Sequence, residues 1–326
     1  MKVVFMGTPD FSVGTLEAIV SAGHEVQAVI TQPDKPKGRG KSMQMTPVKE
    51  KALEHGLEVW QPVKLRTSDV AEKLEALQPD FIVVVAFGQI IPKNILDIPK
   101  FGCINVHASL LPKYRGAAPI QWAVIDGEEK SGVTIMRMDE GLDTGDMLAK
   151  VEVMISDEET GGSLFDALSA AGARLLVESL PKIAAGELTG EKQPAESPNA
   201  YARMITKTDG IIDWNKSAVE IERLVRGLNP WPSAYTRVDG KTLKLWKTTV
   251  AQDAVVCECA NHVDSFESAK PGTVAAADKH FLYVKTGEGY LRLDEVQLEG
   301  KKRMTCDAFL RGYQVAVGET LSEGIE

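Results

Sequence analysis

Short apolar runs alternate with helix-periodic segments through the first part of the chain. KVVFMG at 2–7 and EVQAVITQ at 25–32 flank a stretch with apolar residues at helical spacing. FIVVVAF at 81–87 is apolar throughout and is bounded by Pro79 and Gly88, as expected of a central parallel strand. This alternation predicts a right-handed, doubly wound, mostly parallel α/β sheet, which binds ligands outside the carboxyl ends of its strands.

The same two periods predict the other elements of this sheet. Further strands are expected at 102–107, 132–138 and 146–155. Helices are expected at 11–20, 47–56, 67–78, 117–127 and 162–187.

The pattern changes after this region. Residues 188–209 are polar, contain two prolines and show no sustained apolar period, which is typical of an interdomain linker. One helix is expected at 216–228, and strand-like runs then follow at 233–238, 241–250, 271–277, 281–286 and 290–300. Such runs predict a small β-barrel. We therefore expect one domain at 1–189, a linker at 190–206 and a barrel domain at 207–326.

Composition limits the class of protein. The chain has 326 residues, 44% of them hydrophobic, which suffices for two buried cores. It contains no apolar run of about 18 residues, and its N-terminus turns polar too early for a signal peptide, so a cytoplasmic protein without a membrane segment is expected. The net charge of −9 implies that any nucleic-acid contact comes from local basic surface.

Asn105 and His107 are the first candidates for chemistry. Residues two apart on a strand point to the same side, so an amide and an imidazole are presented together near a strand end. The amide can hold a developing oxyanion while the imidazole donates or accepts a proton. Alone, Asn-x-His more often marks a hydrogen-bonded structural histidine.

The acidic loop at 139–146 is the second candidate. Gly141 and Gly145 permit turn conformations that are closed to other residues, so the loop has a defined shape. A carboxylate in this loop can orient His107. The alternative is a solvated acidic turn.

Together these segments resemble the folate-dependent formyltransferase family. The run from Asn105 to Gly116 reads N-x-H-x-S-x-L-P-x-Y-x-G and is followed by Asp143 in a glycine-bearing loop. The resemblance is closest to the members that formylate methionyl-tRNA and covers nearly the whole chain. It includes VVFMGTPDFSV at the start, TQPDKPKGRG at 31–40, FGQIIP at 87–92, NVHASLLPKYRGAAPIQWA at 105–123 and GLDTGD at 141–146.

The resemblance implies a reaction and a set of catalytic residues. A Rossmann-like formyltransferase domain would transfer the formyl group of 10-formyltetrahydrofolate, a co-substrate, to the amino group of methionyl initiator tRNA. Asn105 and protonated His107 would stabilise the oxyanion, and Asp143 would hold His107 and help to move the proton of the amine. A monomer is expected.

The resemblance also implies binding residues. The folate wall and pterin pocket would comprise Ser109, Leu110, Leu111, Pro112, Phe87, Gln89, Ile90, Ile91, Asp139, Gly141 and Leu142. For Ile90 and Ile91, ordinary core packing is the alternative.

The basic loop at 35–41 would contact the acceptor stem of the tRNA. Four cations stand in these seven residues of an otherwise acidic chain: Lys35, Lys37, Arg39 and Lys41. Arg39 would contribute most. The C-terminal domain would be an oligonucleotide-binding-type (OB-like) barrel that binds tRNA, although any single lysine there is more often a solubilising surface charge.

Other chemistries find little support in the sequence. Cys257-x-Cys259-x-x-His262 lacks a fourth ligand at recognisable spacing, so no metal is expected. The first strand-to-helix turn lacks the G-x-G-x-x-G fingerprint of dinucleotide sites. The rivals are a sugar-nucleotide or glycinamide ribonucleotide formyltransferase, a formyltetrahydrofolate hydrolase domain, and a noncatalytic RNA-binding module, which would leave Asn105, His107 and Asp143 unexplained.

Overall fold

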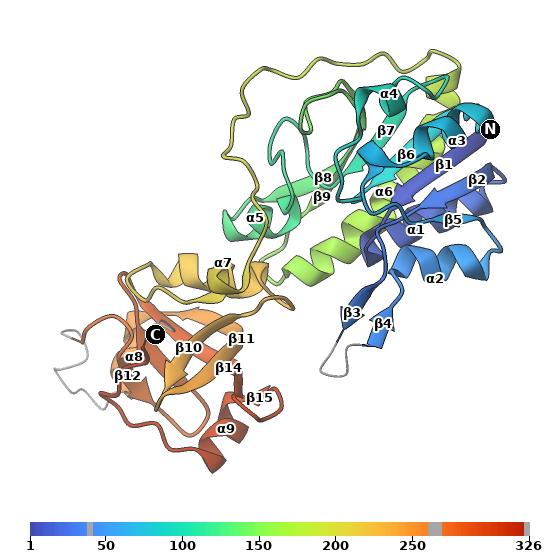
Figure 1. The fold of residues 1–326 in the computed structure, drawn as a ribbon. Coiled ribbons are helices and arrows are strands. Elements are labelled where there is room, and N and C mark those ends of the chain that lie inside the picture. The colour runs from blue at the N-terminus through green and yellow to red at the C-terminus, as the bar shows by residue number, and fades with distance from the viewer. Residues whose placement is uncertain (38–41, 260–268, 323–326) are drawn as a thin grey trace. The chain divides into compact units, whose positions relative to one another are not determined.

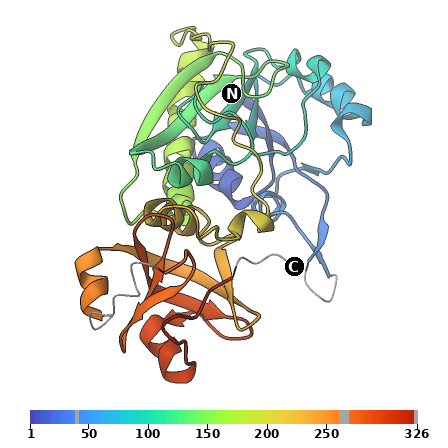
Figure 2. The same ribbon diagram turned by 90° about the vertical axis from the view of Figure 1, so that its left-hand side faces the viewer.

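The computed structural model describes residues 1–37, 42–259 and 269–322, which form two compact units (Figures 1 and 2). The first unit comprises Met1–Pro119, Lys130–Met154 and Leu164–Arg203. The second comprises Ile120–Glu129, Ile155–Ser163 and the residues from Met204 onward. Two short internal segments therefore group with the C-terminal part of the chain.

A seven-stranded sheet forms the centre of the first unit (Figure 1). Its order is β5 (Val59–Trp60), β2 (Glu25–Ile30), β1 (Lys2–Gly7), β6 (Phe81–Val85), β7 (Cys103–His107), β8 (Lys130–Arg137) and β9 (Met147–Met154). The first five strands pair in parallel, whereas β8 runs antiparallel to both β7 and β9. The predicted mostly parallel, doubly wound sheet is confirmed.

Helices cover both faces of this sheet. Phe11 of α1 (Asp10–Ser21) meets Phe165 of α6 (Gly161–Ala184) edge to face at 5.2 Å, so these two helices share one face. On the other face, Val4 and Met6 share a core cluster with apolar residues of α3 (Val70–Leu77) and α4 (Lys93–Leu96). Burial on both faces explains why β1 and β6 read as continuous apolar runs.

Two helices begin where the sequence supplies a cap. Thr46 accepts the backbone N–H of Lys49 at 3.1 Å, and a proline opens α2 (Pro47–Glu54) directly after it. Ser217 accepts the N–H of Glu220 at 3.2 Å, and Glu220 accepts the N–H of Ser217 at 2.9 Å, which completes a capping box at α7 (Ala218–Gly227).

Two short strands flank residues 38–41 of the basic loop. β3 (Lys35–Lys37) and β4 (Ser42–Gln44) pair antiparallel, and Lys35 stands opposite Gln44. The sequence predicted only a loop here, because a three-residue strand gives no measurable period.

The second unit is an antiparallel barrel. Its strands follow the order β10 (Ala234–Val238), β11 (Lys241–Ala251), β14 (Tyr290–Leu298), β13 (Leu282–Lys285) and β12 (Val274–Ala277), and β15 (Met304–Thr305) pairs with β14. Residues 319–322 close the barrel between its two outer strands. Ser322 and Arg237 exchange backbone hydrogen bonds of 3.1 Å, and Glu319 accepts the N–H of Val274 at 2.8 Å. Closure removes the exposed strand edges.

Helical segments of the second unit complete the fold. They are α5 (Pro119–Ile125), the 3₁₀ turn η2 (Lys207–Gly210), α7, α8 (Asp253–Cys259) and α9 (Cys306–Gly312). α9 packs against β14, and both are drawn in orange to red in Figure 2. A further 3₁₀ turn, η1 (Leu65–Thr67), belongs to the first unit. The sequence did not predict α4, α8 or α9, which span only two turns or fewer.

Candidate active site

Asn105 and His107 lie at the carboxyl end of β7, as predicted. They stand opposite Met136 and Thr134 of β8, and their exposed fractions are 9% and 6%. Cys103, two residues before Asn105, belongs to the cluster on the α3 and α4 face of the sheet, so both polar side chains point to that side. Within the described residues, the Asn105 side chain makes no hydrogen bond, which leaves its amide available to a ligand.

The imidazole of His107 lies between two oxygen atoms. Its Nε2 is 3.0 Å from the carbonyl oxygen of Tyr114, and its Nδ1 is 3.8 Å from Oδ1 of Asp143. A carbonyl oxygen only accepts hydrogen bonds, so Nε2 carries a proton in this arrangement. The 3.8 Å separation is too long for a direct hydrogen bond, so Nδ1 stays available to a reacting group.

Asp143 is placed by a strained turn. Its backbone is left-handed, with φ 55°, and its Oδ2 accepts the backbone N–H of Gly116 at 2.9 Å. Gly145, two residues later, cannot be replaced, because an added Cβ would lie 1.8 Å from the carbonyl oxygen of Arg137. The structure thus brings together Asn105, His107 and Asp143, which lie in two separate segments of the sequence.

Hydrogen bonds from buried hydroxyl groups hold the turn that follows β7. Ser109 is fully buried, and its hydroxyl donates to the carbonyl oxygen of Lys113 at 2.7 Å. Thr134 donates to the carbonyl oxygen of Ser109 at 2.7 Å and accepts the N–H of Leu111 at 3.1 Å. Leu111 packs with Met136, and the peptide bond to Pro112 is cis. Leu110 is half-buried. These residues form one wall beside His107.

The residues expected around a pterin ring differ in exposure. Phe87 and Ile91 are buried in the core cluster on the α3 and α4 face of the sheet, whereas Ile90 and Leu142 are 78% and 58% exposed. The Gln89 side chain is occupied, since its Oε1 accepts the N–H of Leu65 at 2.8 Å and its Nε2 donates to Pro62.

Asp139 shapes its own exposed loop. Its Oδ1 accepts the N–H of Gly141 at 2.9 Å and the hydroxyl of Thr144 at 2.7 Å. Among the expected pterin contacts, Ile90 and Leu142 therefore offer the exposed apolar surface.

Only part of the basic loop can be described. Lys35 lies on β3 and forms no ion pair with any described residue. The backbone of Lys37 lies on the same strand. Arg39 and Lys41, also predicted to bind tRNA, lie outside the described residues.

Three residues beside the site were not predicted. Arg115 belongs to the Asn105–Gly116 motif, and its side chain is only 7% exposed. Gln193 donates to the carbonyl oxygens of Asp143 and Gly145 at 2.9 and 2.8 Å. The ring of Tyr201 packs against Gly116, and burial together with the charge of Asp143 raises its pKa. No local sequence pattern signals the burial of Arg115, since arginine is seldom buried, or the contacts of Gln193 and Tyr201.

Cys103 lies two residues before Asn105, but its thiol is unreactive. Burial, with a smaller effect from the charge of Asp97, raises the pKa of its thiol to about 12. At neutral pH the thiol is therefore protonated and is a poor nucleophile.

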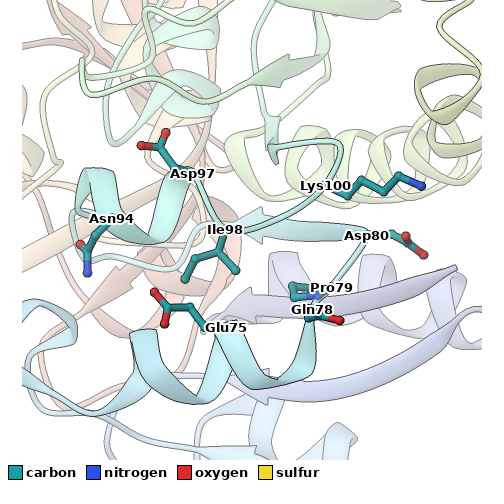
Figure 3. A pocket seen from close by; sticks show the side chains of 8 residues that line it. All are labelled: Glu75, Gln78, Pro79, Asp80, Asn94, Asp97, Ile98 and Lys100. Carbon is teal, nitrogen blue, oxygen red and sulfur yellow. The ribbon is translucent and has the colours of Figure 1, made fainter.

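A pocket between α3 and α4 lies at the opposite edge of the sheet (Figure 3). It is lined by Glu75, Gln78, Pro79, Asp80, Asn94, Asp97, Ile98 and Lys100. Asp80 directly precedes β6, so this pocket faces the amino ends of the strands, away from His107. No predicted site residue lines it.

Among residues 1–37, 42–259 and 269–322, no group of three or more His, Cys, Asp and Glu side chains is arranged to hold a metal ion. His262 of the Cys257-x-Cys259-x-x-His262 run lies outside these residues. Across the same residues, no helix is both long and apolar enough to cross a membrane.

Comparison with known proteins identifies relatives along nearly the whole chain. Residues 1–180 match the family model described as formyl transferase, and residues 204–314 match that of the formyl transferase C-terminal domain. The chain is 60% identical over 319 residues to a methionyl-tRNA formyltransferase of Agathobacter rectalis, with 98% of each chain covered. It is 56% identical to that of Lachnospira eligens, covering 99% of this chain and 100% of the relative.

Solved structures share the fold at low sequence identity. An N-formyltransferase from Helicobacter canadensis, in complex with folinic acid and dTDP-3-aminofucose, superposes with a TM-score of 0.64 at 19% identity, covering 93% of this chain and 100% of that one. HypX from Aquifex aeolicus, in complex with tetrahydrofolic acid, gives a TM-score of 0.61 at 17% identity, covering 98% of this chain and 50% of that one.

Proposed function

Because this chain belongs to the formyl transferase family, we propose that it transfers the formyl group of 10-formyltetrahydrofolate to the α-amino group of methionyl initiator tRNA. The observation that carries the proposal is the convergence of Asn105, His107 and Asp143 at the carboxyl end of β7. Relatives at 60% and 56% identity over nearly their full lengths support this choice of acceptor.

The chemistry follows from the three side chains. The free amine of the methionyl group attacks the formyl carbon, and the formyl oxygen takes up the negative charge of a tetrahedral intermediate. The unoccupied Asn105 amide and the protonated imidazole of His107 stabilise this oxygen. Removing one such donor lowers the rate by about 10²–10³.

Asp143 accepts the proton that the attacking amine loses. Its carboxylate is fixed by the N–H of Gly116 and lies close to Nδ1 of His107, beyond hydrogen-bonding distance. It holds the imidazole and accepts the proton lost by the amine, which then passes, through water, to N10 of the departing folate. Breakdown of the intermediate releases tetrahydrofolate and the formylated aminoacyl-tRNA.

The folate is bound by the surrounding segments. The wall formed by Ser109, Leu110, Leu111 and Pro112 borders the formyl-bearing part, and the exposed side chains of Ile90 and Leu142 enclose the pterin ring. Phe87 and Ile91 support this pocket from beneath. Gln89, and the loop that contains Asp139 and Gly141, present backbone groups to the polar edge of the ring.

The tRNA is bound by basic segments of an acidic chain. Lys35, Lys37, Arg39 and Lys41 contact backbone phosphates of the acceptor stem, and the barrel domain at 207–326 holds the rest of that stem. Residues 1–189 are the catalytic domain and 190–206 connect the two. The protein acts as a monomer in the cytoplasm.

The test combines the purified chain with 10-formyltetrahydrofolate and charged methionyl initiator tRNA. Acid-stable formyl-methionine is measured beside a reaction without tRNA and one with an amino-sugar nucleotide. Formation of formyl-methionine that disappears in Asn105→Ala supports the proposal. Folate turnover without tRNA would reassign the chain as a hydrolase, and formylation of the sugar alone would reassign its acceptor.

A further inference from the structure

Arg115 is a buried cation whose hydrogen-bond partners among the described residues are all neutral. Its Nε donates to Oε1 of Gln193 at 3.0 Å, while its two terminal nitrogens donate to the carbonyl oxygens of Ala195 at 3.2 Å and Pro194 at 2.7 Å. An arginine that is 7% exposed without a carboxylate partner is uncommon. The rigid guanidinium instead fixes the course of residues 193–195.

Arg115 also decides which way the Gln193 amide faces. A guanidinium can only donate, so the oxygen of the Gln193 amide must point toward it. The amide nitrogen then points the other way and donates to the carbonyl oxygens of Asp143 at 2.9 Å and Gly145 at 2.8 Å. One amide group thus bridges both ends of the turn that carries the Asp143 carboxylate.

This turn needs an external restraint. Asp143 has φ 55°, a left-handed conformation that a residue with a side chain adopts at some energetic cost. The two hydrogen bonds from Gln193 offset this cost, because they are satisfied only when both carbonyl groups point the same way.

The segment around Gln193 follows both loops of the site. Glu191 exchanges backbone hydrogen bonds of 2.9 Å with Met147, Ser197 donates to the carbonyl oxygen of Pro112 at 2.9 Å, and Ala202 donates to that of Arg115 at 2.8 Å. Figure 1 shows this segment, between α6 and α7, as extended chain. Residues 191–202, which read as a linker in the sequence, therefore also form part of the wall of the site.

We propose that Gln193, oriented by Arg115, is a positioning residue that holds Asp143 in its working conformation. The inference rests on the proposed function, because it assigns Gln193 a role only through Asp143. Gln193 reaches the Asp143 backbone and not its carboxylate, so it takes no part in the proton transfer itself.

Gln193→Glu tests the role of the amide donor. The new carboxylate keeps its bond to Arg115 but cannot donate to the two carbonyl oxygens. We expect kcat for formylation to fall by about 10–100-fold, because small misplacements of a reacting group have effects of this size. The KM values for folate and for tRNA should stay within about twofold, since the Gln193 side chain bonds only to Arg115 and to two backbone carbonyl oxygens and not to a side chain assigned to either substrate.

A double-mutant cycle separates positioning from general stabilisation. Single-turnover formylation with enzyme in excess is measured for Gln193→Glu in the wild-type chain and in Asp143→Ala. If Gln193 acts through Asp143, its substitution changes the residual rate of Asp143→Ala by no more than about twofold. The same fold-loss in both backgrounds would overturn the proposal, as would an unchanged rate for Gln193→Glu alone.

Two further variants complete the experiment. Gln193→Met conserves volume and removes both polar ends, so it should lower kcat by the same factor. It replaces Gln193→Glu in the test if that variant fails to fold. Gln27→Glu is the matched control, because the Gln27 amide donates to the carbonyl oxygen of Leu77 at 3.1 Å and belongs to neither loop of the site. It should leave kcat unchanged.

Absence of formyl-methionine with the unaltered chain would overturn the proposed function, whereas normal turnover by the Gln193 variants overturns only the positioning role.

Discussion

Asp143 faces His107 across 3.8 Å without forming a direct hydrogen bond to it. The other carboxylate oxygen of Asp143 is occupied by the backbone N–H of Gly116 at 2.9 Å, so the carboxylate cannot swing away freely. A gap of this size keeps both groups available to a reacting amine. In the proposed mechanism, these two side chains are therefore already in place before the substrates bind.

Asn105→Ala should lower kcat by about 10²–10³, because it removes one donor to the oxyanion. The side chain makes no hydrogen bond to the described residues, so its removal should leave the melting temperature nearly unchanged. Steady-state formylation and thermal unfolding measure the two effects. Asn94→Ala, in the pocket at the opposite edge of the sheet, is the control (Figure 3). Equal activity of the two variants would remove Asn105 from the mechanism.

Ile90→Ser should weaken folate binding without destabilising the fold. The Ile90 side chain is 78% exposed in the free protein, so folding gains little from it. Covering it with a pterin ring contributes affinity, and its loss should raise the KM for folate about tenfold, equivalent to about 1.4 kcal/mol. Val63→Ser, at a site that is 79% exposed, should change nothing. A folate KM unaffected by Ile90→Ser would place the pterin elsewhere.

Charge reversal in the basic loop should act on tRNA alone. Lys35→Glu and Arg39→Glu should each raise the KM for tRNA and leave the KM for folate unchanged. Each lost phosphate contact should also reduce the slope of log affinity against log salt by about 0.9. Lys100→Glu, near the amino ends of the strands, is the control. The same rise in tRNA KM for Lys100→Glu would point to a general charge effect and not to contact by the loop.

Cys103 and Cys306 should resist alkylation in the folded protein. Burial is the main cause that raises the pKa of both thiols to about 12. At about pH 8 both stay protonated when folded, whereas unfolding returns them to about 8.5 and exposes the reactive thiolate. Mass spectrometry after iodoacetamide treatment, with and without denaturant, should show this difference, with half-buried Cys257 as the reference.

Activity of a Cys103 variant completes that prediction. Cys103→Ala should retain normal turnover, since the mechanism needs no covalent nucleophile. Alkylation of Cys103 in the native protein, with parallel loss of activity, would contradict both statements.

Much of the fold could be predicted because the strongest periods in the sequence are local. FIVVVAF forms β6 at Phe81–Val85, and the five runs of the second domain coincide with β10 to β14. The hairpin of β3 and β4 is too short for a period. Closure of the barrel by residues 319–322 depends on pairing with Arg237 and Val274, which are far away in sequence.

The site shows the same division. The two-residue period of a strand paired Asn105 with His107, and glycines marked a shaped acidic loop, whereas the choice of Asp143 within that loop came from the family resemblance. Gln193 gave no signal, because its partners Asp143 and Gly145 lie about 50 residues earlier and its own segment reads as a polar linker. Local patterns reveal residues that act on one element, whereas a hydrogen bond between distant loops appears only in the folded chain.

Single-turnover formylation of methionyl-tRNA by Asp143→Asn tests the central claim most directly. Asparagine keeps an acceptor for the N–H of Gly116 but loses the charge that faces His107 and the ability to take the amine's proton. We predict that the rate of formyl transfer falls by about 10²–10⁴ while the equilibrium affinities for folate and tRNA stay unchanged. A transfer rate equal to that of the wild-type chain would contradict the assignment of Asp143, and with it the proposed mechanism.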